Sequence, residues 1–189
     1  MQQLRRHSQT DRVFVGFAGR SGAGKTFAAK YLSSRYGFQY TRYSRILHEW
    51  LASDIADRER LQTLGWEVMA GGRQAELNAR LIARLDPSQS AVIDGLRHLI
   101  DFDALSEAFG ASFGMIFLES GREVRFERLR SRLSTFESFI AADSQPVEAH
   151  IDSLKARAST IILNEQSLEA LCEQLDAWVS HQAGIGVST

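Results

Sequence analysis

The fold of this chain is decided by one glycine-rich stretch, Gly19-Arg20-Ser21-Gly22-Ala23-Gly24-Lys25-Thr26. It matches G-x-x-x-x-G-K-[ST], the pattern of a phosphate-binding loop or P-loop. The apolar run 13–18 comes just before it and has the β-branched and aromatic content of a buried strand. The segment 25–35 follows with apolar residues at helical spacing. Strand, glycine turn and helix are the context that the motif requires, which favours a phosphate site over a chance match.

The glycines, the lysine and the threonine of this stretch each suit a phosphate site for a physical reason. The backbone N–H groups of the turn must point at one phosphate, and glycine tolerates the φ and ψ values that this requires. The free N–H groups and the dipole at the helix start add positive potential. We therefore expect residues 19–26 to bind the phosphates of ATP. Lys25 would reach the β- and γ-phosphates, and the Thr26 hydroxyl would take one Mg²⁺ position.

Composition and charge narrow the class of protein. The chain has 189 residues, 44% of them hydrophobic, which is enough for one full core and predicts one domain. The net charge of −1 provides no global attraction for nucleic acid or an anionic membrane, although a local basic cleft stays possible. The single cysteine, Cys172, excludes an internal disulfide framework and suits a reducing compartment. With no apolar run of membrane-spanning length and no signal-like start, we expect a cytoplasmic protein.

The periodicity of the chain predicts strands that alternate with helices. The expected strands are 13–18, 38–41, 90–94, 112–118 and 160–163. The expected helices are 25–35, 44–51, 57–69, 73–85, 101–109, 122–133, 146–158 and 167–180. This order predicts an α/β fold with a five-stranded parallel sheet between two helical layers. We expect the domain to cover 13–181, with a flexible arm at 1–12 and a frayed tail at 182–189.

Asp94 ends a buried strand and is the second candidate functional residue. Ligands of parallel sheets bind beyond the carboxyl ends of the strands, so Asp94 and the P-loop can share one crevice. There Asp94 would hold Mg²⁺, directly or through water, or orient the attacking oxygen of an acceptor. Gly95 leaves room for a ligand, and Arg97 is suited to an acceptor phosphate. The alternative is that Asp94 only caps the next turn, but a P-loop nearby favours the functional role.

The predicted helix 122–133 carries arginines at helical spacing, Arg125, Arg128 and Arg132. Cations on one side of a helix repel each other unless an anion lies opposite, and phosphoryl transfer needs such cations to offset charge on the transferred group. The alternative is a solvated face neutralised by Glu123 and Glu127. The sequence leaves these two interpretations open. The candidate catalytic residues are then Lys25, Asp94, Arg128 and Arg132.

The acceptor side has weaker signals. The helical insertion of about 42–86 separates the second strand from the Asp94 strand and contributes several polar candidates. With Arg97, the candidate acceptor contacts are Arg45, His48 and Arg80, of which His48 fits a helix-surface residue better than a base. Aromatic residues that could stack on a base are Tyr40, Tyr43, Trp50 and Trp66, although aromatics at helical spacing are usually core.

Together these motifs resemble the P-loop kinases of small metabolites, the group that contains the nucleoside monophosphate kinases and dephospho-CoA kinase. The resemblance is carried by 19–26, by 92–97 and by 125–132, and the ending 158–169 is similar to that group's last strand and helix. It implies ATP–Mg²⁺ as donor, an acceptor-binding helical region, and an arginine-bearing lid at about 128–146. One departure is that related sequences place an acid and then an arginine after the second strand, where this chain has Ser44-Arg45-Ile46-Leu47-His48.

We therefore expect an ATP- and Mg²⁺-dependent phosphotransferase whose acceptor is a (deoxy)nucleoside monophosphate or a related nucleotide. Two alternatives stay within the kinases: dephospho-CoA, or a modified base carried in nucleic acid. A third alternative is a regulatory nucleotide-binding NTPase. The near-neutral charge argues against a nucleic-acid partner.

Overall fold

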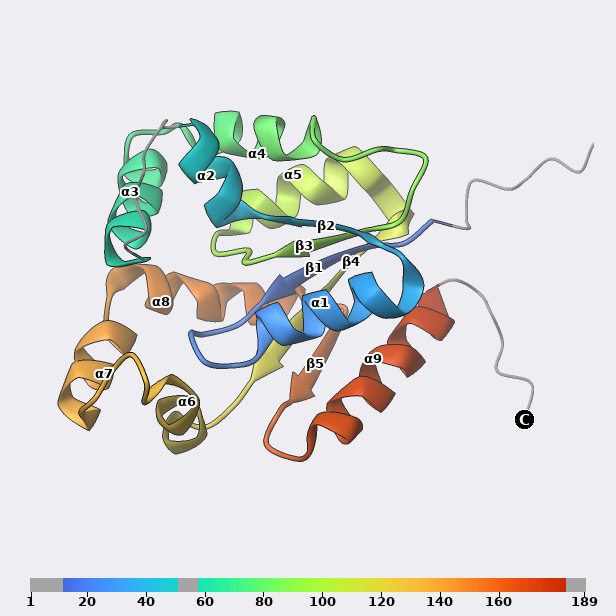
Figure 1. Ribbon diagram of the computed structural model, residues 1–189. Coiled ribbons are helices and arrows are strands. Elements are labelled where there is room, and N and C mark those ends of the chain that lie inside the picture. The colour runs from blue at the N-terminus through green and yellow to red at the C-terminus, as the bar shows by residue number, and fades with distance from the viewer. Residues whose placement is uncertain (1–11, 51–57, 183–189) are drawn as a thin grey trace, which may run out of the picture.

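A computed structural model describes residues 12–50 and 58–182 (Figure 1). The expectations for 1–11, for 51–57 and for 183–189 lie outside the described residues. Five strands form one parallel sheet in the order β2-β3-β1-β4-β5. They are β1 (Phe14–Ala18), β2 (Gln39–Arg42), β3 (Ala91–Asp94), β4 (Phe113–Glu119) and β5 (Thr160–Leu163). The predicted α/β class and the five parallel strands are confirmed.

The helices alternate with the strands along the chain. The first half contains α1 (Lys25–Tyr36), α2 (Tyr43–Trp50), α3 (Arg58–Ala70), α4 (Gln74–Ile82) and α5 (Leu99–Phe109). The second half contains α6 (Arg122–Leu129), α7 (Phe136–Asp143), α8 (Pro146–Ile151) and α9 (Leu168–Gln182), with short 3₁₀ segments at Gly110–Ser112 and Asp152–Arg157. No helix in the described part of the chain is long and apolar enough to cross a membrane.

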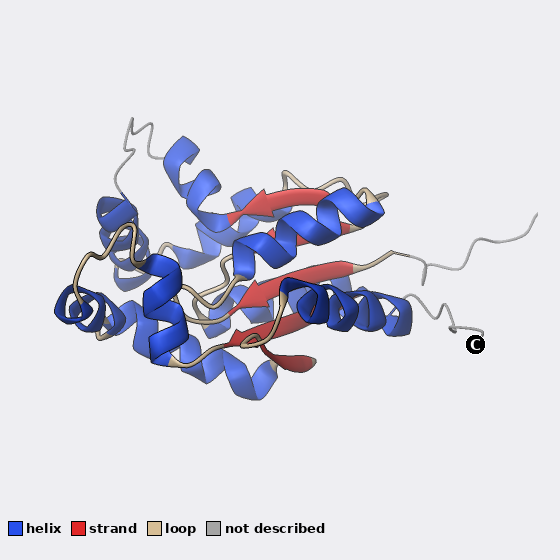
Figure 2. Cartoon of the chain, turned by 60° about the horizontal axis from the view of Figure 1, so that its bottom comes forward, coloured by secondary structure: helices blue, strands red, loops and turns tan. Residues whose placement is uncertain are grey.

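Two apolar cores lie on opposite faces of the sheet, because successive strand side chains point to opposite sides. In β1, Val15 and Phe17 face the layer formed by α1 and α9. Phe14 and Ala18 face the other layer, which contains α4 and α5 (Figures 1 and 2). The strands are therefore apolar on both faces, as expected of a parallel sheet covered by helices.

Several predicted boundaries differ from the structure for local reasons. The predicted helix 122–133 ends at Leu129, because Thr135 caps α7 and turns the chain out of the helix. Ser44 does not cap α2, since the helix already begins at Tyr43 and the Ser44 hydroxyl accepts a hydrogen bond from Arg42 Nε. The predicted helix 146–158 becomes α-helical only to Ile151 and continues as a 3₁₀ segment.

The core on the α1 side provides a stability test. Leu32 of α1 is fully buried, so Leu32→Ala should cost about 2–5 kcal/mol of unfolding free energy through lost transfer energy and the cavity left behind. Leu168→Ala is the matched control because Leu168 is 54% exposed, and it should change the free energy by less than about 0.5 kcal/mol. Urea unfolding measures both. Equal effects of the two substitutions would contradict the assignment of the core.

Candidate functional site

The turn between β1 and α1 has a backbone that requires glycine. Gly19, Gly22 and Gly24 have φ of 136°, 84° and 104°, where a side chain is strained. A Cβ on Gly19 would lie 2.2 Å from the Leu118 carbonyl oxygen, and one on Gly24 would lie 2.4 Å from Asn164 Nδ2. The turn is therefore pressed against β4 and the end of β5. Glycine is needed in this turn both for its positive φ values and for the close approach of neighbouring atoms.

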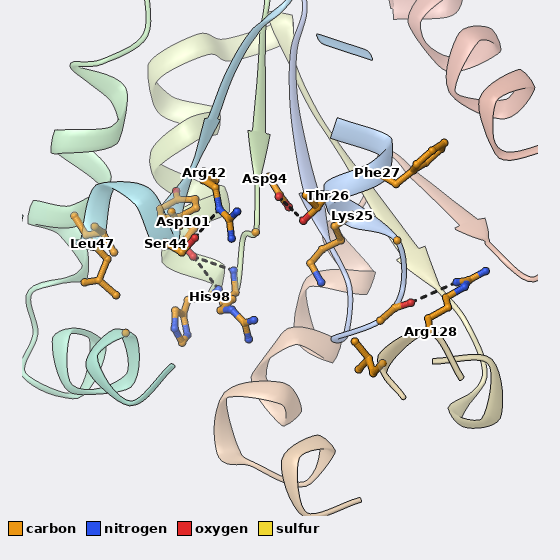
Figure 3. Close-up of a pocket in the computed structure, with 18 of the residues that line it drawn as sticks. Lys25, Thr26, Phe27, Arg42, Ser44, Leu47, Asp94, His98, Asp101 and Arg128 are labelled. Atoms are coloured by element: carbon orange, nitrogen blue, oxygen red, sulfur yellow. Dashed lines mark hydrogen bonds between the residues drawn. The ribbon is translucent and has the colours of Figure 1, made fainter. Parts of the chain in front are cut away.

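The positive groups of the turn face its interior. Gly24 is the N-cap of α1 and offers no side chain to the first N–H groups of the helix, which leaves these donors suited to an anion. Lys25 is buried, and its Nζ donates to the carbonyl oxygens of Gly19 at 2.5 Å and Arg20 at 3.0 Å. The ammonium group thus lies over the concave side of its own loop, as Figure 3 shows.

A hydroxyl and a carboxylate meet beside the turn. Thr26 Oγ1 donates to Asp94 Oδ2 at 2.8 Å (Figure 3). Tyr40 donates its hydroxyl to the same oxygen at 3.1 Å. Burial and the Asp94 charge raise the pKa of Tyr40 to about 12, so the phenol remains a donor. Hydroxyl and carboxylate oxygens are the ligands that Mg²⁺ prefers, usually one or two from the protein, the rest being phosphates and water. Thr26 and Asp94 therefore fit the magnesium position of a phosphate site.

A cavity of about 340 Å³ opens from the turn toward the helices that follow β2 and β3. Gly22, Gly24, Lys25 and Thr26 line its donor end, with Asp94 and Gly95 beside them. Its other walls contain both apolar and polar side chains: Arg42, Tyr43, Ser44, Leu47, Gln74, Leu77, Arg97, His98, Asp101, Leu129 and the two arginines 128 and 132. One continuous space is thus lined by the end of the glycine-rich turn and by these arginines.

Several arginines of this cavity lack an acidic partner. Within residues 12–50 and 58–182, no carboxylate lies at ion-pair distance from Arg42, Arg128 or Arg132. Arg128 instead donates to backbone and hydroxyl oxygens, Asn164 O at 2.8 Å and Ser120 Oγ at 3.0 Å. Burial lowers the pKa of Arg128 from its ordinary value. Asp94 and Asp101 also line the cavity, but neither lies at ion-pair distance from these three arginines, whose charge therefore suits an anionic ligand.

Not every predicted site residue reaches the cavity. Asp94, Arg97, Arg128 and Arg132 line it, as does the second half of the glycine-rich turn. Arg45 and Arg80 do not line it: they form surface ion pairs with Glu49 and Glu76 at 2.9 Å each. His48 is also absent from the lining, and of the predicted aromatic contacts Tyr43 is present while Tyr40, Trp50 and Trp66 are not.

The arginines of the predicted stripe have different surroundings in the structure. Arg125 is buried and forms a bidentate pair with Asp143, with Nη1 at 2.5 Å and Nη2 at 3.0 Å from the two carboxylate oxygens. The anion opposite Arg125 is therefore a side chain of α7. Because α6 ends at Leu129, Arg132 lies beyond the helix and not on one face with Arg128. Neither open interpretation included Asp143, which lies 18 residues further along the chain.

Sequence reasoning missed several lining residues. Arg42 could have been found, since it ends β2 in register with Asp94 and must lie at the same edge of the sheet. Gln74 and Asp101 gave no signal, because they come from α4 and α5 and meet only in the folded chain. Asp101 accepts hydrogen bonds from Gln74 Nε2 at 2.5 Å and from the backbone N–H groups of Arg97 and His98. These bonds fix the loop that carries Arg97 into the cavity.

Asp143 of α7 connects α6 with the glycine-rich turn. Arg125, Arg20 and Arg122 all lie within ion-pair distance of its carboxylate. Burial raises the pKa of Asp143, but Arg125 and Arg20 outweigh burial, so its net pKa lies below the ordinary value. The folded protein then binds fewer protons here than the unfolded chain. The stabilisation is present above the unfolded pKa and is lost as the pH falls through the folded one.

We expect this linkage to show in acid unfolding. Wild-type stability should fall steeply below about pH 4, where an unfolded aspartate begins to protonate. Asp143→Asn should flatten that dependence and cost roughly 3–5 kcal/mol at pH 7, because it leaves Arg125 buried without a counter-charge. Asp103→Asn, which breaks an exposed pair with Arg157, is the control and should cost under about 1 kcal/mol. Urea unfolding from pH 3 to 7 measures all three, and parallel curves for wild type and Asp143→Asn would contradict the linkage.

Known proteins of similar sequence include two that are described as UPF0200 proteins. No protein-family model matches the chain. It is 29% identical over 167 residues to a UPF0200 protein of Pyrobaculum aerophilum, covering 85% of this chain and 93% of that one. It is 27% identical over 170 residues to a UPF0200 protein of Aeropyrum pernix, covering 85% and 89%.

Solved structures extend the likeness to the whole fold. A gluconokinase from Sinorhizobium meliloti matches with a TM-score of 0.61 and 17% identity, over 93% of this chain and 95% of that chain. A shikimate kinase from Acinetobacter baumannii, in complex with shikimate, matches with a TM-score of 0.60 and 15% identity, over 95% and 97%. A sugar kinase from Janibacter sp. matches with a TM-score of 0.56 and 20% identity, over 93% and 96%. The chain therefore has the P-loop kinase fold, as its motifs predicted.

Proposed function

We propose that this protein is an ATP- and Mg²⁺-dependent phosphotransferase that moves the γ-phosphate to a small acceptor, a (deoxy)nucleoside monophosphate or a related nucleotide. The observation that carries the proposal is the continuous cavity between the phosphate-binding turn and Arg42, Arg97 and Arg132. A site for a triphosphate at one end and a cationic wall at the other is the arrangement that phosphoryl transfer to an anionic acceptor needs. The gluconokinase and shikimate kinase with the same fold are kinases of small molecules.

The donor end supplies charge and orientation. Lys25 and the N–H groups of 19–26 hold the β- and γ-phosphates, and Lys25 exchanges its present carbonyl partners for phosphate oxygens. Thr26 and Asp94 would hold a magnesium ion, which would supply positive charge to offset that of the phosphates. An acceptor oxygen attacks the γ-phosphorus while the bond to the bridging β-oxygen breaks, which leaves ADP. Arg128 and Arg132 offset the charge that spreads over the transferred group.

The acceptor end favours a nucleotide. Arg42 and Arg97 at the ends of β2 and β3 suit a phosphate, because guanidinium groups bind phosphate oxygens in pairs. Gln74 Oε1 and the Tyr43 hydroxyl are buried without a hydrogen-bond partner among the described residues, and both residues line the cavity. Burial raises the pKa of Tyr43 well above its ordinary value, so it stays protonated. A base edge with N–H and C=O groups would satisfy both atoms.

This assignment changes the residues proposed for the acceptor. Arg97 is kept and Arg42 is added, whereas Arg45, His48 and Arg80 lie outside the cavity lining. The proposal keeps the acceptor insertion at about 42–86 and the lid at about 128–146, within one domain of 13–181. ATP as donor and a single cysteine suit the cytoplasm.

A phosphate-transfer panel tests the proposal. Mg-ATP labelled in the γ-phosphate should transfer label to at least one nucleoside monophosphate, and Lys25→Met should lower the rate by 10²-fold or more because it removes the ammonium at the β- and γ-phosphates. The panel includes dephospho-CoA, sugar and hydroxy acids, and oligonucleotides. Transfer to one of those compounds but to no nucleoside monophosphate would show that the proposed acceptor is wrong and would identify another. Mg-ATP hydrolysis with no accelerating acceptor would favour a regulatory NTPase.

The lid assignment has its own test. Arg132→Ala should lower kcat by about 10²-fold or more and change ATP affinity by less than about threefold, because its charge is needed mainly as the phosphoryl group moves. Arg130→Ala is the matched control: Arg130 is a neighbouring arginine outside the cavity lining that pairs with Glu127 at 3.3 Å. Steady-state kinetics and calorimetry measure the two quantities. A wild-type kcat in Arg132→Ala would contradict the role.

A further inference from the structure

A buried carboxylate from α8 touches both ends of the site. Glu148 is 1% exposed and belongs to none of the sequence motifs. Its Oε2 accepts the Ser21 N–H at 3.0 Å, and its Oε1 accepts the Ser21 hydroxyl at 2.9 Å. The same Oε1 accepts Arg97 Nη1 at 3.1 Å. One side chain therefore connects the phosphate-binding turn with the acceptor-side arginine.

Glu148 is charged in this position. Burial raises its pKa, but Arg97, Lys25 and the two Ser21 hydrogen bonds outweigh burial, so the net pKa lies below the ordinary value. A buried ionised carboxylate is costly unless it is paired and hydrogen-bonded, and here each of its oxygens has a partner. The charged carboxylate thus binds Ser21 and Arg97 and holds them in place.

Glu148 does not line the cavity, whereas Arg97 does. It can therefore act on bound phosphates only through its partners and through its field. We propose that Glu148 is a positioning residue that fixes Arg97 relative to the phosphate-binding turn, so that acceptor and γ-phosphate are held in line. This inference rests on the proposed phosphoryl transfer.

The two effects of this carboxylate have opposite signs. Its negative charge lies close to where anionic ligands bind and disfavours their binding. Its hydrogen bonds fix the relative position of two groups that must act together, and a misplacement of about 1 Å can cost about 10²-fold in rate. Removing the charge without changing the shape should therefore tighten acceptor binding and slow transfer. A residue with only a structural role would weaken binding or stability instead.

Two variants separate the effect of the Glu148 charge from the effect of its side-chain length. Glu148→Gln keeps the shape and one acceptor oxygen but loses the charge. It should lower KM for the best nucleoside monophosphate of the panel by about 3–10-fold and kcat by about 10-fold or more. Glu148→Asp keeps the charge but shortens the side chain, so it should lower kcat without lowering KM. It also serves as the second variant if Glu148→Gln unfolds.

Inorganic phosphate provides a probe that does not depend on turnover. Calorimetric titration of phosphate into the complex of the protein with MgADP should show tighter binding to Glu148→Gln than to wild type, and unchanged or weaker binding to Glu148→Asp. Glu76→Gln is the control for a paired glutamate, because Glu76 contacts two arginines on the surface, and it should change neither quantity. Thermal unfolding of each variant identifies effects that come from the fold alone.

The outcomes distinguish this inference from the proposed function. Wild-type kcat in both variants, or a higher KM in Glu148→Gln together with a large drop in Tm, would overturn the positioning role and leave phosphoryl transfer intact. A wild type that neither binds Mg-ATP nor transfers its phosphate would overturn both. Lower KM with lower kcat in Glu148→Gln supports the inference.

Discussion

The shape of the cavity depends on contacts that hold the glycine-rich turn from outside. The N–H groups of the turn can face a phosphate only if its carbonyl oxygens and outer side chains have other partners. The structure supplies these partners from distant parts of the chain: Asn164 donates to Ala23 O, Arg125 to Ser21 O, and Glu148 accepts from Ser21. The conformation of the turn is therefore held by the protein itself and does not need a bound ligand.

The arginines of the site differ in whether a carboxylate pairs with them. The arginines that need a fixed place have carboxylate partners, as in Arg125 with Asp143 and Arg97 with Glu148. Arg42 and Arg132 line the cavity with no carboxylate of the described residues at ion-pair distance. An ion pair fixes the position of an arginine and offsets part of its charge, whereas an arginine without such a partner keeps its full charge. This division explains why residues of the same type, close in sequence, have different roles.

Predictions from sequence were accurate where the signal is local or periodic. The strand Thr160–Leu163 has the bounds that were predicted, and the glycine-rich turn lies between β1 and α1 as its motif requires. Errors appeared where a tertiary contact overrides periodicity. The spacing placed Arg125 in a stripe of arginines that faces a ligand, but Arg125 forms an ion pair with Asp143 of α7. Arg45 and Arg80 looked available for an acceptor, but i,i+4 pairing holds both on the surface.

The sequence by itself determined the fold class, the position of the glycine-rich turn and the place of Asp94 beside it, because these follow from short-range spacing and from the rule that carboxyl ends of parallel strands share one edge. The tertiary structure alone decided which charges are neutralised and which remain for a ligand. Glu148 lies 127 residues from Ser21 and 51 from Arg97. No periodicity along the chain connects such positions, since their contact exists only after α8 packs against the turn.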